Sequence, residues 1–262
     1  MPNYIAVSRA KHANLRWSGP TRFDFAARDA IVPLVAQEFP RAQLCMPIAF
    51  VAQGDGFSPV AVLGLQAGRN LFVAADGRWL DGCYIPAMYR GYPFALAAGA
   101  DGQQVLVCAE DSALISETAG AAFFDAQGNP DPAVQAVLDF LAQVQQNRAV
   151  TERICSALAQ YGLIQPWPIS LQMEGDARRV EGLFRIDETA LNALPAESLA
   201  ALQQVGALPV AYCQLLSMQH LPQLGKLNAV QQASARLQSA AAAGESGQGF
   251  LDGSDTISFG GL

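Results

Sequence analysis

The 262-residue chain has little of the material from which most catalytic and metal-binding sites are built. It has two histidines, His12 and His220, and five scattered cysteines, none in a Cys-x-x-Cys pair. An odd number of dispersed cysteines argues against a disulfide framework or a zinc site and favours reduced, buried thiols. The sequence also lacks GxSxG, HExxH, P-loop and GxGxxG motifs. We therefore predict no metal and no cofactor, and we favour a protein without catalytic activity.

Charge is scarce as well. Charged residues make up 15% of the chain and the formal net charge is −7. Binding to nucleic acid or to an anionic membrane surface needs a basic face, so neither is expected. Fourteen arginines stand against two lysines; arginine suits buried carboxylate contacts, although a GC-rich genome would give the same bias. The low charge leaves neutral surface for a protein partner or a homo-oligomer.

Long apolar runs are missing. No stretch approaches the roughly 20 uninterrupted apolar residues of a membrane span, and residues 1–17 lack the apolar segment of a signal peptide. The expected location is the cytoplasm. At 262 residues the chain is long enough to bury a full core. Since 51% of its residues are apolar, it is expected to be globular. We expect one domain over residues 1–227, with a potential division near 162–165, and an Ala/Gln/Ser-rich segment with an acidic tail over 228–262.

Hydrophobic periodicity and turn signals predict an α+β fold. A mostly antiparallel sheet is packed by a long helix or helix pair, and a smaller αβ element follows. Asp131 and Pro132 are typical of a helix start, and Gly162 of a helix end. The other expected elements are a helix at 30–39, a meander of strands at 47–53, 60–66 and 71–75, a hairpin of 94–98 with 104–109, strands 169–173 and 183–187 around a polar turn, helices from 188 and at 197–205, and a core element at 208–218.

Aromatic residues and two arginines gather within residues 71–94. They could line a pocket in which the arginines hold an anionic or carbonyl ligand. Alternatively, the tyrosines cap the sheet and Arg90 pairs with an acidic residue such as Glu110 or Asp111. The predicted ligand-binding residues are Arg78, Trp79, Tyr84, Tyr89, Arg90 and Tyr92.

Three further features have both a functional and a structural interpretation. His12 is either a site histidine or a packing residue, because a catalytic histidine needs a partner and the sequence indicates none. Glu110 and Asp111 would point to opposite faces of a strand, which favours a turn or cap role. The turn after Asp125 has too few oxygen ligands for calcium.

The C-terminal tail carries apolar residues in an acidic, flexible context after a Gly/Ser-containing linker. It could dock on a partner by strand addition, serve as an uncleaved export signal, or fold back onto its own sheet edge. The predicted docking residues are Phe250, Leu251, Ile257 and Phe259.

Several motifs taken together resemble those of the SapC-like (S-layer-related) bacterial family. They are K-H-x-N-L at residues 11–15, DGRW at 76–79 followed by YIPA and YPF, E-D-S at 110–112, FFDAQGNP at 123–130, GLFRID at 182–187 and a G-A-L ending near 206. The resemblance covers about residues 5–225. The family name derives from S-layer export operons, and relatives occur in gene clusters with TonB-dependent receptors and flavin-dependent halogenase-like enzymes. The resemblance implies an accessory role in an envelope or nutrient-uptake system.

The leading hypothesis is a non-catalytic cytoplasmic accessory protein that binds a protein partner, an envelope or gene-cluster protein, or a small ligand. It would use the aromatic and arginine region and the tail. One alternative is an uncharacterised enzyme with an aromatic and arginine pocket for a small anionic substrate. Another is an exported S-layer-associated protein that reaches the cell surface without a signal peptide.

Overall fold

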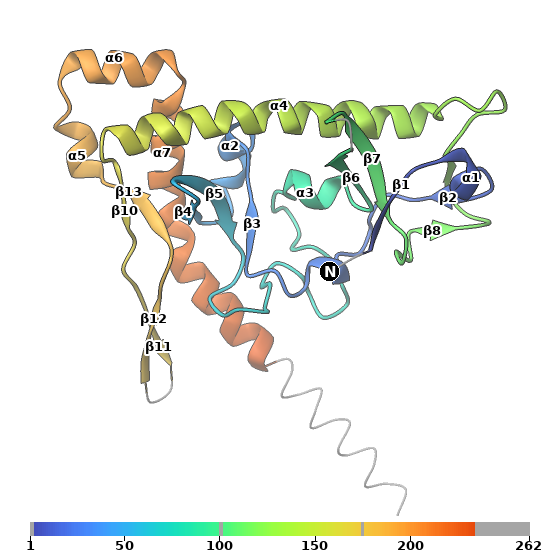
Figure 1. Cartoon of the computed structure of the whole chain (residues 1–262). Coiled ribbons are helices and arrows are strands. Elements are labelled where there is room, and N and C mark those ends of the chain that lie inside the picture. The colour runs from blue at the N-terminus through green and yellow to red at the C-terminus, as the bar shows by residue number, and fades with distance from the viewer. Residues whose placement is uncertain (1–2, 100–101, 174–175, 234–262) are drawn as a thin grey trace, which may run out of the picture.

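The computed structural model describes residues 3–99, 102–173 and 176–233. Two antiparallel sheets lie along one long helix, α4 (Pro132–Gln160), as Figure 1 shows. The five-stranded sheet lies beside the C-terminal half of α4, and the sheet β1-β7-β6 lies beside its N-terminal half. The predicted α+β class is therefore confirmed.

The five-stranded sheet has the order β10-β13-β4-β5-β3. Its centre is the β4–β5 hairpin, whose register runs from Gln53↔Gly56 to Ile48↔Ala61. Gly54 closes the turn with a φ of +57°, a conformation that glycine adopts without strain. The strands are β3 (Ile31–Pro33), β4 (Ile48–Gln53), β5 (Gly56–Val62), β10 (Ile164–Pro166) and β13 (Phe184–Ile186).

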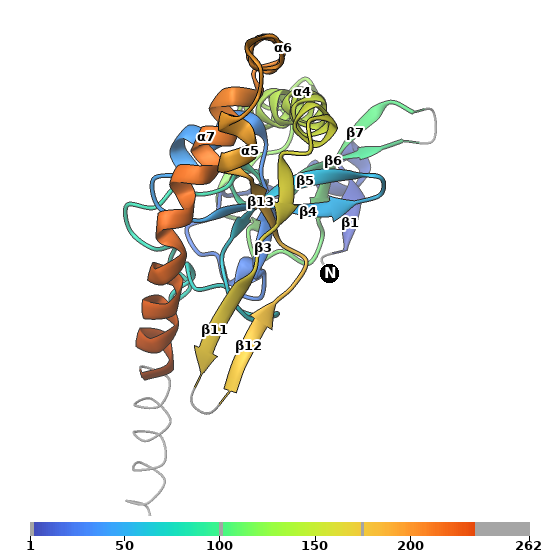
Figure 2. The ribbon, with the colours of Figure 1, turned by 90° about the vertical axis from the view of Figure 1, so that its left-hand side faces the viewer.

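The second sheet has β7 at its centre, so β6 is an edge strand. The strands of this sheet are β1 (Tyr4–Ala6), β6 (Phe94–Ala98) and β7 (Gln104–Ala109). A further small sheet has the order β8-β2-β9, with β2 (Arg16–Trp17), β8 (Ile115–Ser116) and β9 (Ala121–Ala122). The hairpin of β11 (Ile169–Met173) and β12 (Asp176–Val180) projects from the body of the molecule (Figure 2).

Helix α4 begins as the sequence predicts. Asp131 is its N-cap and accepts a hydrogen bond from the Ala133 N–H at 2.9 Å, and Pro132 is the first helical residue. The helix is continuous over 29 residues and ends just before Gly162, which has a φ of +65°. A single helix, not a bent pair, therefore connects the two sheets.

The two halves of α4 pack into different hydrophobic cores. Val134 enters a small core with Phe94, Cys108 and Phe123. Leu158, fully buried, belongs to a large core that also holds the β4–β5 hairpin. The middle of α4 thus passes from one core to the other, and this arrangement creates the groove described below.

The C-terminal helices fasten onto the five-stranded sheet through buried polar groups. Gln214 of α7 (Ala207–Ser217) is fully buried; its amide donates to the Ile48 carbonyl at 3.0 Å and accepts from the Ile186 N–H at 2.9 Å. Asp187 caps α5 as predicted, accepting from the Ala190 N–H at 3.0 Å. The remaining helices are α1 (Arg9–His12), α2 (Phe39–Ala42), α3 (Ala87–Arg90), α5 (Glu188–Asn192) and α6 (Ala196–Gln204), with 3-10 turns at Asp24–Ala26, Ala36–Glu38 and Met218–His220 and helical residues at 221–233.

The expected helix at 30–39 is wrong. Ile31 and Val32 form strand β3 and pair with Val62 and Ala61 of β5. Their β-branched side chains suit a strand, and Pro33 is tolerated because β3 is at the sheet edge. The helix comes later, at α2, with Pro40 in its first turn.

Two expected strand pairings are also wrong. Residues 71–75 form a single bridge, Val73↔Trp79, because β3 takes the place beside β5 where the third strand of the meander was expected. A polar turn was expected at residues 175–179; residue 175 lies outside the described residues, and residues 176–179 belong to strand β12, which pairs with β11. Strand β13 pairs instead with β10 and β4. The β12 residues Asp-Ala-Arg-Arg-Val are mostly polar, so the segment lacks the apolar signal on which the prediction relied.

Candidate functional site

Trp79 and Tyr89, two of the predicted ligand-binding residues, lie in the large core. Trp79 is 7% exposed, and its ring packs against Phe72 and Tyr89 with centroids 5.6 and 5.7 Å away. The Tyr89 hydroxyl donates to Asp29 Oδ2 at 3.0 Å. Burial, followed by the Asp29 charge, raises the pKa of Tyr89. Protein atoms therefore occupy the surroundings of both rings.

Arg90 reaches a buried carboxylate through a tyrosine. Its Nη2 donates to the Tyr84 hydroxyl at 2.8 Å, and that hydroxyl donates to Glu38 Oε1 at 3.0 Å. The guanidinium carbon also lies 4.9 Å from the centroid of the Phe140 ring, a cation–π contact with α4. Burial and the Glu38 charge raise the pKa of Tyr84 to about 12, so its hydroxyl keeps its proton. Arg90 does not contact Glu110 or Asp111 among the described interactions, contrary to the pairing expected above.

Arg78 and Tyr92 are placed differently. Arg78 is exposed, and its Nε donates to Asp76 Oδ2 at 2.6 Å. Tyr92 stacks on Phe25 with ring centroids 3.8 Å apart and an interplanar angle of 13°. Contacts thus link Trp79 and Tyr89 by ring packing and Tyr84 and Arg90 by a hydrogen bond, whereas Arg78 is engaged at the surface. A ligand-binding role for the six residues stays a prediction.

A sizeable cavity lies elsewhere, beneath the middle of α4. It is a groove of about 730 Å³, and none of the six predicted residues lines it. We call it the α4 groove. Its lining comes from α4 (Leu141, Val144, Arg148, Glu152), the β4–β5 hairpin (Asp55, Phe57, Ser58), β6 (Phe94, Ala95, Leu96) and the segments around Val35, Glu38 and Met88. The groove therefore fills the interval between the two cores that α4 connects.

Two strand edges border the α4 groove. Along β6, the three successive residues Phe94, Ala95 and Leu96 all line it, and along the β5 strand Gly56 to Pro59 do the same. On the face of a strand only alternate residues would be in contact, so the groove runs along the edges. β6 is the outer strand of its sheet, and β3 covers β5 only from Pro59 onward. The Phe94 N–H already donates to the Gly91 carbonyl at 2.8 Å. By the register of the two hairpins, the backbone groups of Leu96 on β6 and of Phe57 on β5 point away from the paired strand and toward the groove.

The polar groups of the groove are unevenly charged. Three carboxylates line it, from Glu38, Asp55 and Glu152, against one cation, Arg148. Glu38 is 5% exposed and fully engaged, since Oε1 accepts from the Ala87 N–H at 2.7 Å and Oε2 from the Val35 N–H at 2.9 Å. Glu38 therefore ties the groove wall to the Tyr84–Arg90 pair, while Asp55 and Glu152 remain exposed at the surface.

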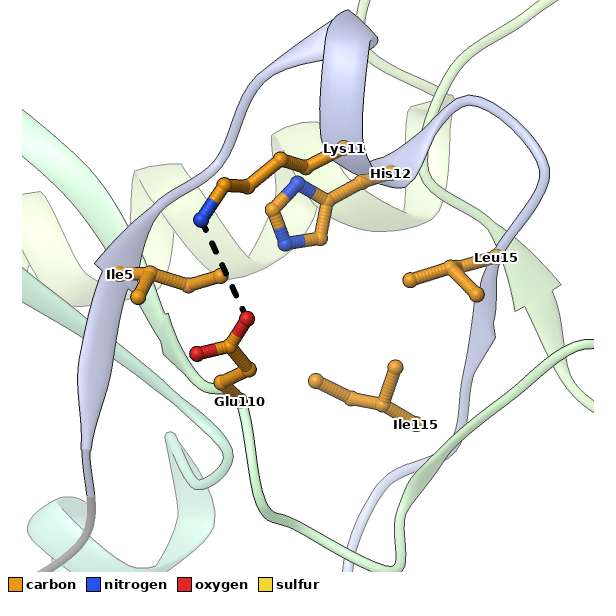
Figure 3. Close-up of a pocket in the computed structure, with 6 residues that line it drawn as sticks. All are labelled: Ile5, Lys11, His12, Leu15, Glu110 and Ile115. Carbon is orange, nitrogen blue, oxygen red and sulfur yellow. Dashed lines mark ion pairs between the residues drawn. The ribbon is translucent and has the colours of Figure 1, made fainter.

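A second, smaller cavity of about 220 Å³ lies beside His12 (Figure 3). Lys11 and Glu110 point toward one another across it, with Nζ and Oε1 3.9 Å apart. The His12 ring is 1% exposed; its Nδ1 lies 3.1 Å from the Ser8 carbonyl and its Nε2 lies 3.3 Å from Cys108 Sγ. The fold thus supplies a partner for His12 that the sequence did not indicate.

The His12–Cys108 contact lacks the properties of a nucleophilic pair. Cys108 is fully buried, and burial followed by the charge of Glu110 raises the pKa of its thiol to about 11. A reactive cysteine needs the thiolate and access to its substrate. The contact therefore favours the packing interpretation of His12, whose ring also lies 5.0 Å from that of Phe123.

Over residues 3–99, 102–173 and 176–233, no group of three or more His, Cys, Asp or Glu side chains is arranged to hold a metal ion. In the same ranges, no single helix has the length and hydropathy to cross a bilayer; Ala196–Gln204 and Ala207–Ala233 meet that test as a pair, across a 95° bend. The predicted tail residues Phe250, Leu251, Ile257 and Phe259 lie outside the described residues.

Comparison of the sequence with models of protein families identifies the family of the chain. The family model described as SapC matches residues 7–224. No curated protein and no solved structure matches the chain.

Proposed function

The chain belongs to the SapC family, and we propose that it is a non-catalytic accessory protein of the cytoplasm. It would be part of an envelope or nutrient-uptake system. There it would bind an extended segment of a protein partner in the α4 groove. The observation that carries the proposal is the pair of strand edges along this groove. The binding surface is therefore the α4 groove and not the region of Trp79 and Tyr89, whose rings pack in the large core.

The shape of the groove suits an extended peptide. A strand rises about 3.3 Å per residue. An extended peptide has the same rise, so it would place one residue beside each of the lining residues Phe94 to Leu96. A peptide placed there can pair with the β6 edge, as in other cases of strand addition. Its side chains would meet the apolar groups of Phe57, Val144 and Leu141.

The charges of the groove define the expected partner further. Asp55 and Glu152 give its exposed surface more negative than positive charge, since Arg148 is the one cation in the lining. We therefore expect a segment that alternates apolar residues with at least one lysine or arginine. An acidic segment would meet like charges and bind more weakly.

The α4 helix provides a matched pair of variants for the test. Val144 lines the groove, whereas Val150 is on the same helix, is 37% exposed and does not line it. A random-peptide display library should select peptides on the wild-type protein, and the selected peptides can be synthesised for titration. Val144→Arg should weaken their binding at least roughly tenfold, about 1.4 kcal/mol, while Val150→Arg should leave it unchanged.

Amide chemical shifts provide the location. In the wild-type protein the bound peptide should shift the amides of Leu96 and Phe57 and slow their hydrogen exchange. Equal affinities of the two arginine variants, or shifts confined to the region around Trp79, would refute the groove as the binding site. Circular dichroism of both variants establishes that the fold is retained.

The C-terminal tail is a separate part of the proposal. Its residues Phe250, Leu251, Ile257 and Phe259 would dock on a partner by strand addition. Full-length protein and a variant that ends at Gly244 should be used side by side as baits in a lysate of the native cell. Recovery of an envelope or gene-cluster protein by the full-length bait and not by the shortened one is the expected result. Equal recovery by both baits would remove the tail from the proposal and leave the groove untouched.

A further inference from the structure

Cys45 and Cys83 are distant in sequence but adjacent in the structure. Cys45 follows helix α2, and Cys83 lies in the connector between Trp79 and α3. The Cys83 side chain lies close enough to Cys45 to lower the pKa of the Cys45 thiol. The backbone N–H of Tyr84, the residue after Cys83, also donates to Cys45 Sγ at 3.2 Å. The Tyr84 N–H contact thus brings the Cys45 sulfur beside the backbone of Cys83.

Backbone and side-chain hydrogen bonds fix both segments that carry the pair. The Cys83 N–H donates to the Leu80 carbonyl at 3.1 Å, and the Trp79 indole N–H donates to the Tyr84 carbonyl at 3.2 Å. On the other side, the Cys45 N–H donates to the Ala42 carbonyl at 3.2 Å. The fold thus holds the two backbone segments that carry the cysteines next to each other.

The surroundings of Cys45 favour its thiolate. Hydrogen bonding from the Cys83 thiol, then from the Tyr84 N–H, together with the nearby charge of His220, lowers the pKa of Cys45 to about 7. The same contact raises the pKa of Cys83. Both side chains are half-buried, so small reagents can reach them. A thiolate beside a protonated thiol is the arrangement of a nucleophile and its resolving cysteine.

The other three cysteines provide a contrast. Cys108 and Cys155 are buried, and burial raises the pKa of their thiols to about 11 and about 12. Cys213 is half-buried like the pair, but burial raises its pKa, and no described interaction joins it to a second thiol. The environment that favours a thiolate is therefore specific to Cys45.

We propose that Cys45 and Cys83 form a reactive dithiol site that hydrogen peroxide converts to a disulfide. The Cys45 thiolate attacks one peroxide oxygen, the O–O bond breaks, and with one proton the products are a Cys45 sulfenic acid and water. The Cys83 sulfur then attacks the Cys45 sulfur, the S–O bond breaks, and the hydroxyl leaves as water with the Cys83 proton. In total, two thiols and one hydrogen peroxide give one disulfide and two water molecules.

The site lies beside the wall of the α4 groove. Tyr84 donates from its N–H to Cys45 and from its hydroxyl to Glu38, which lines the groove. Oxidation of Cys45 removes the anionic acceptor of the Tyr84 N–H. The dithiol site itself does not depend on what binds in the groove, so the two proposals can fail separately.

The test uses reduced, full-length protein and hydrogen peroxide as the oxidant. The wild-type protein should lose two titratable thiols, and peptide mapping should find an intramolecular link between Cys45 and Cys83 that dithiothreitol reverses. Cys83→Ala should stop at a sulfenic acid on Cys45, which dimedone traps. Cys45→Ala should lose the reaction, while the control Cys213→Ala should behave as the wild type.

Three results would overturn the proposal. They are an absence of the Cys45–Cys83 link after oxidation, oxidation of Cys45→Ala at the wild-type rate, and a link found only between chains. Circular dichroism before and after oxidation shows whether the fold is retained, so that thiols that react only after unfolding are recognised. Alkylation by iodoacetamide at pH 7 gives an independent readout, since Cys45 should react at least roughly fivefold faster than Cys213.

Discussion

Arg90 and Arg78 have the same charge but very different surroundings. Arg90 donates to the Ile85 carbonyl at 3.1 Å and to the Tyr84 hydroxyl at 2.8 Å, and it lies over the Phe140 ring of α4. Arg78 donates to Asp76, two residues before it, and both side chains are largely exposed. Arg90 thus connects helix α3 with the segment before it and with α4, whereas the side chain of Arg78 contacts only its own turn among the described interactions.

The two arginines should therefore respond differently to truncation. Arg90→Ala should lower the melting temperature by about 2–4 °C, the shift that roughly 1 kcal/mol produces in a protein of this size. Arg78→Ala should leave it unchanged, because an exposed ion pair contributes little. Thermal unfolding followed by circular dichroism measures both. If the double variant keeps its stability but loses binding of an anionic ligand, the predicted ligand-binding role of this region is supported instead.

The alkylation rate of Cys45 should depend on pH. Its pKa of about 7 means that its alkylation rate should rise through neutral pH and level off above it. An ordinary thiol, with a pKa near 8.5, continues to rise beyond pH 8. Cys83→Ala removes the largest cause of the shift, so the midpoint of the rate profile should move to higher pH. Rates from mass spectrometry over pH 5.5–10, a range of roughly the two pKa values ±1.5, measure both profiles, and a midpoint that stays in place would contradict the assigned cause.

At the scale of elements, α4 depends on its continuity. Its middle turn, around Ala149, is exposed and packs into neither core, yet it must hold the two buried ends in register. Ala149→Pro removes a backbone hydrogen bond and should cost about 3 kcal/mol or more. Ala149→Gly, the matched control, should cost about 1 kcal/mol. Urea unfolding gives both values, and equal costs would show that a break in α4 is absorbed locally.

The sequence predicts elements well where the local signal and the tertiary contacts agree. For α4, the Asp131 cap, Pro132 and Gly162 mark both ends, and the structure confirms them. For the segment at 30–39, the apolar spacing suits a helix, but pairing with β5 makes its first part a strand. Strand pairing is a long-range property, so a local pattern cannot reveal it.

The α4 groove shows the same limit for the site. Its residues come from elements far apart in the chain, and its defining feature is that β6 is an edge strand. Strand order is not encoded in any one segment. Residues 94–98 are continuously apolar, a pattern typical of a covered strand, yet Ala95 and Leu96 are half-buried beside the groove. Cys45 and Cys83 likewise meet only through the fold, since neither lies in a recognisable cysteine motif.

At the scale of the whole molecule, the two cores share one helix and should unfold together. Phe123→Ala in the small core and Leu158→Ala in the large core each remove a fully buried side chain, at a cost of about 2–5 kcal/mol. Both variants should show one unfolding transition with all probes, because α4 couples the cores. Hydrogen exchange should then be faster in β6–β7 and in β4–β5 for either variant. A second transition, or faster exchange limited to the mutated core, would show that α4 does not couple them.

The arrangement of the two cores also orders events during synthesis. The small core is built from residues between 5 and 141, whereas the large core needs residues as late as 227. Synthesis proceeds from the N-terminus, so a growing chain contains every residue of the small core well before the large core is complete. Until then, strands β3, β4 and β5 form a long segment between Trp17 and Phe94, and β4 lacks the α7 helix that contacts it in the finished protein. The interval in which a chaperone has most to shield therefore falls after α4 has been made and before α7 has left the ribosome.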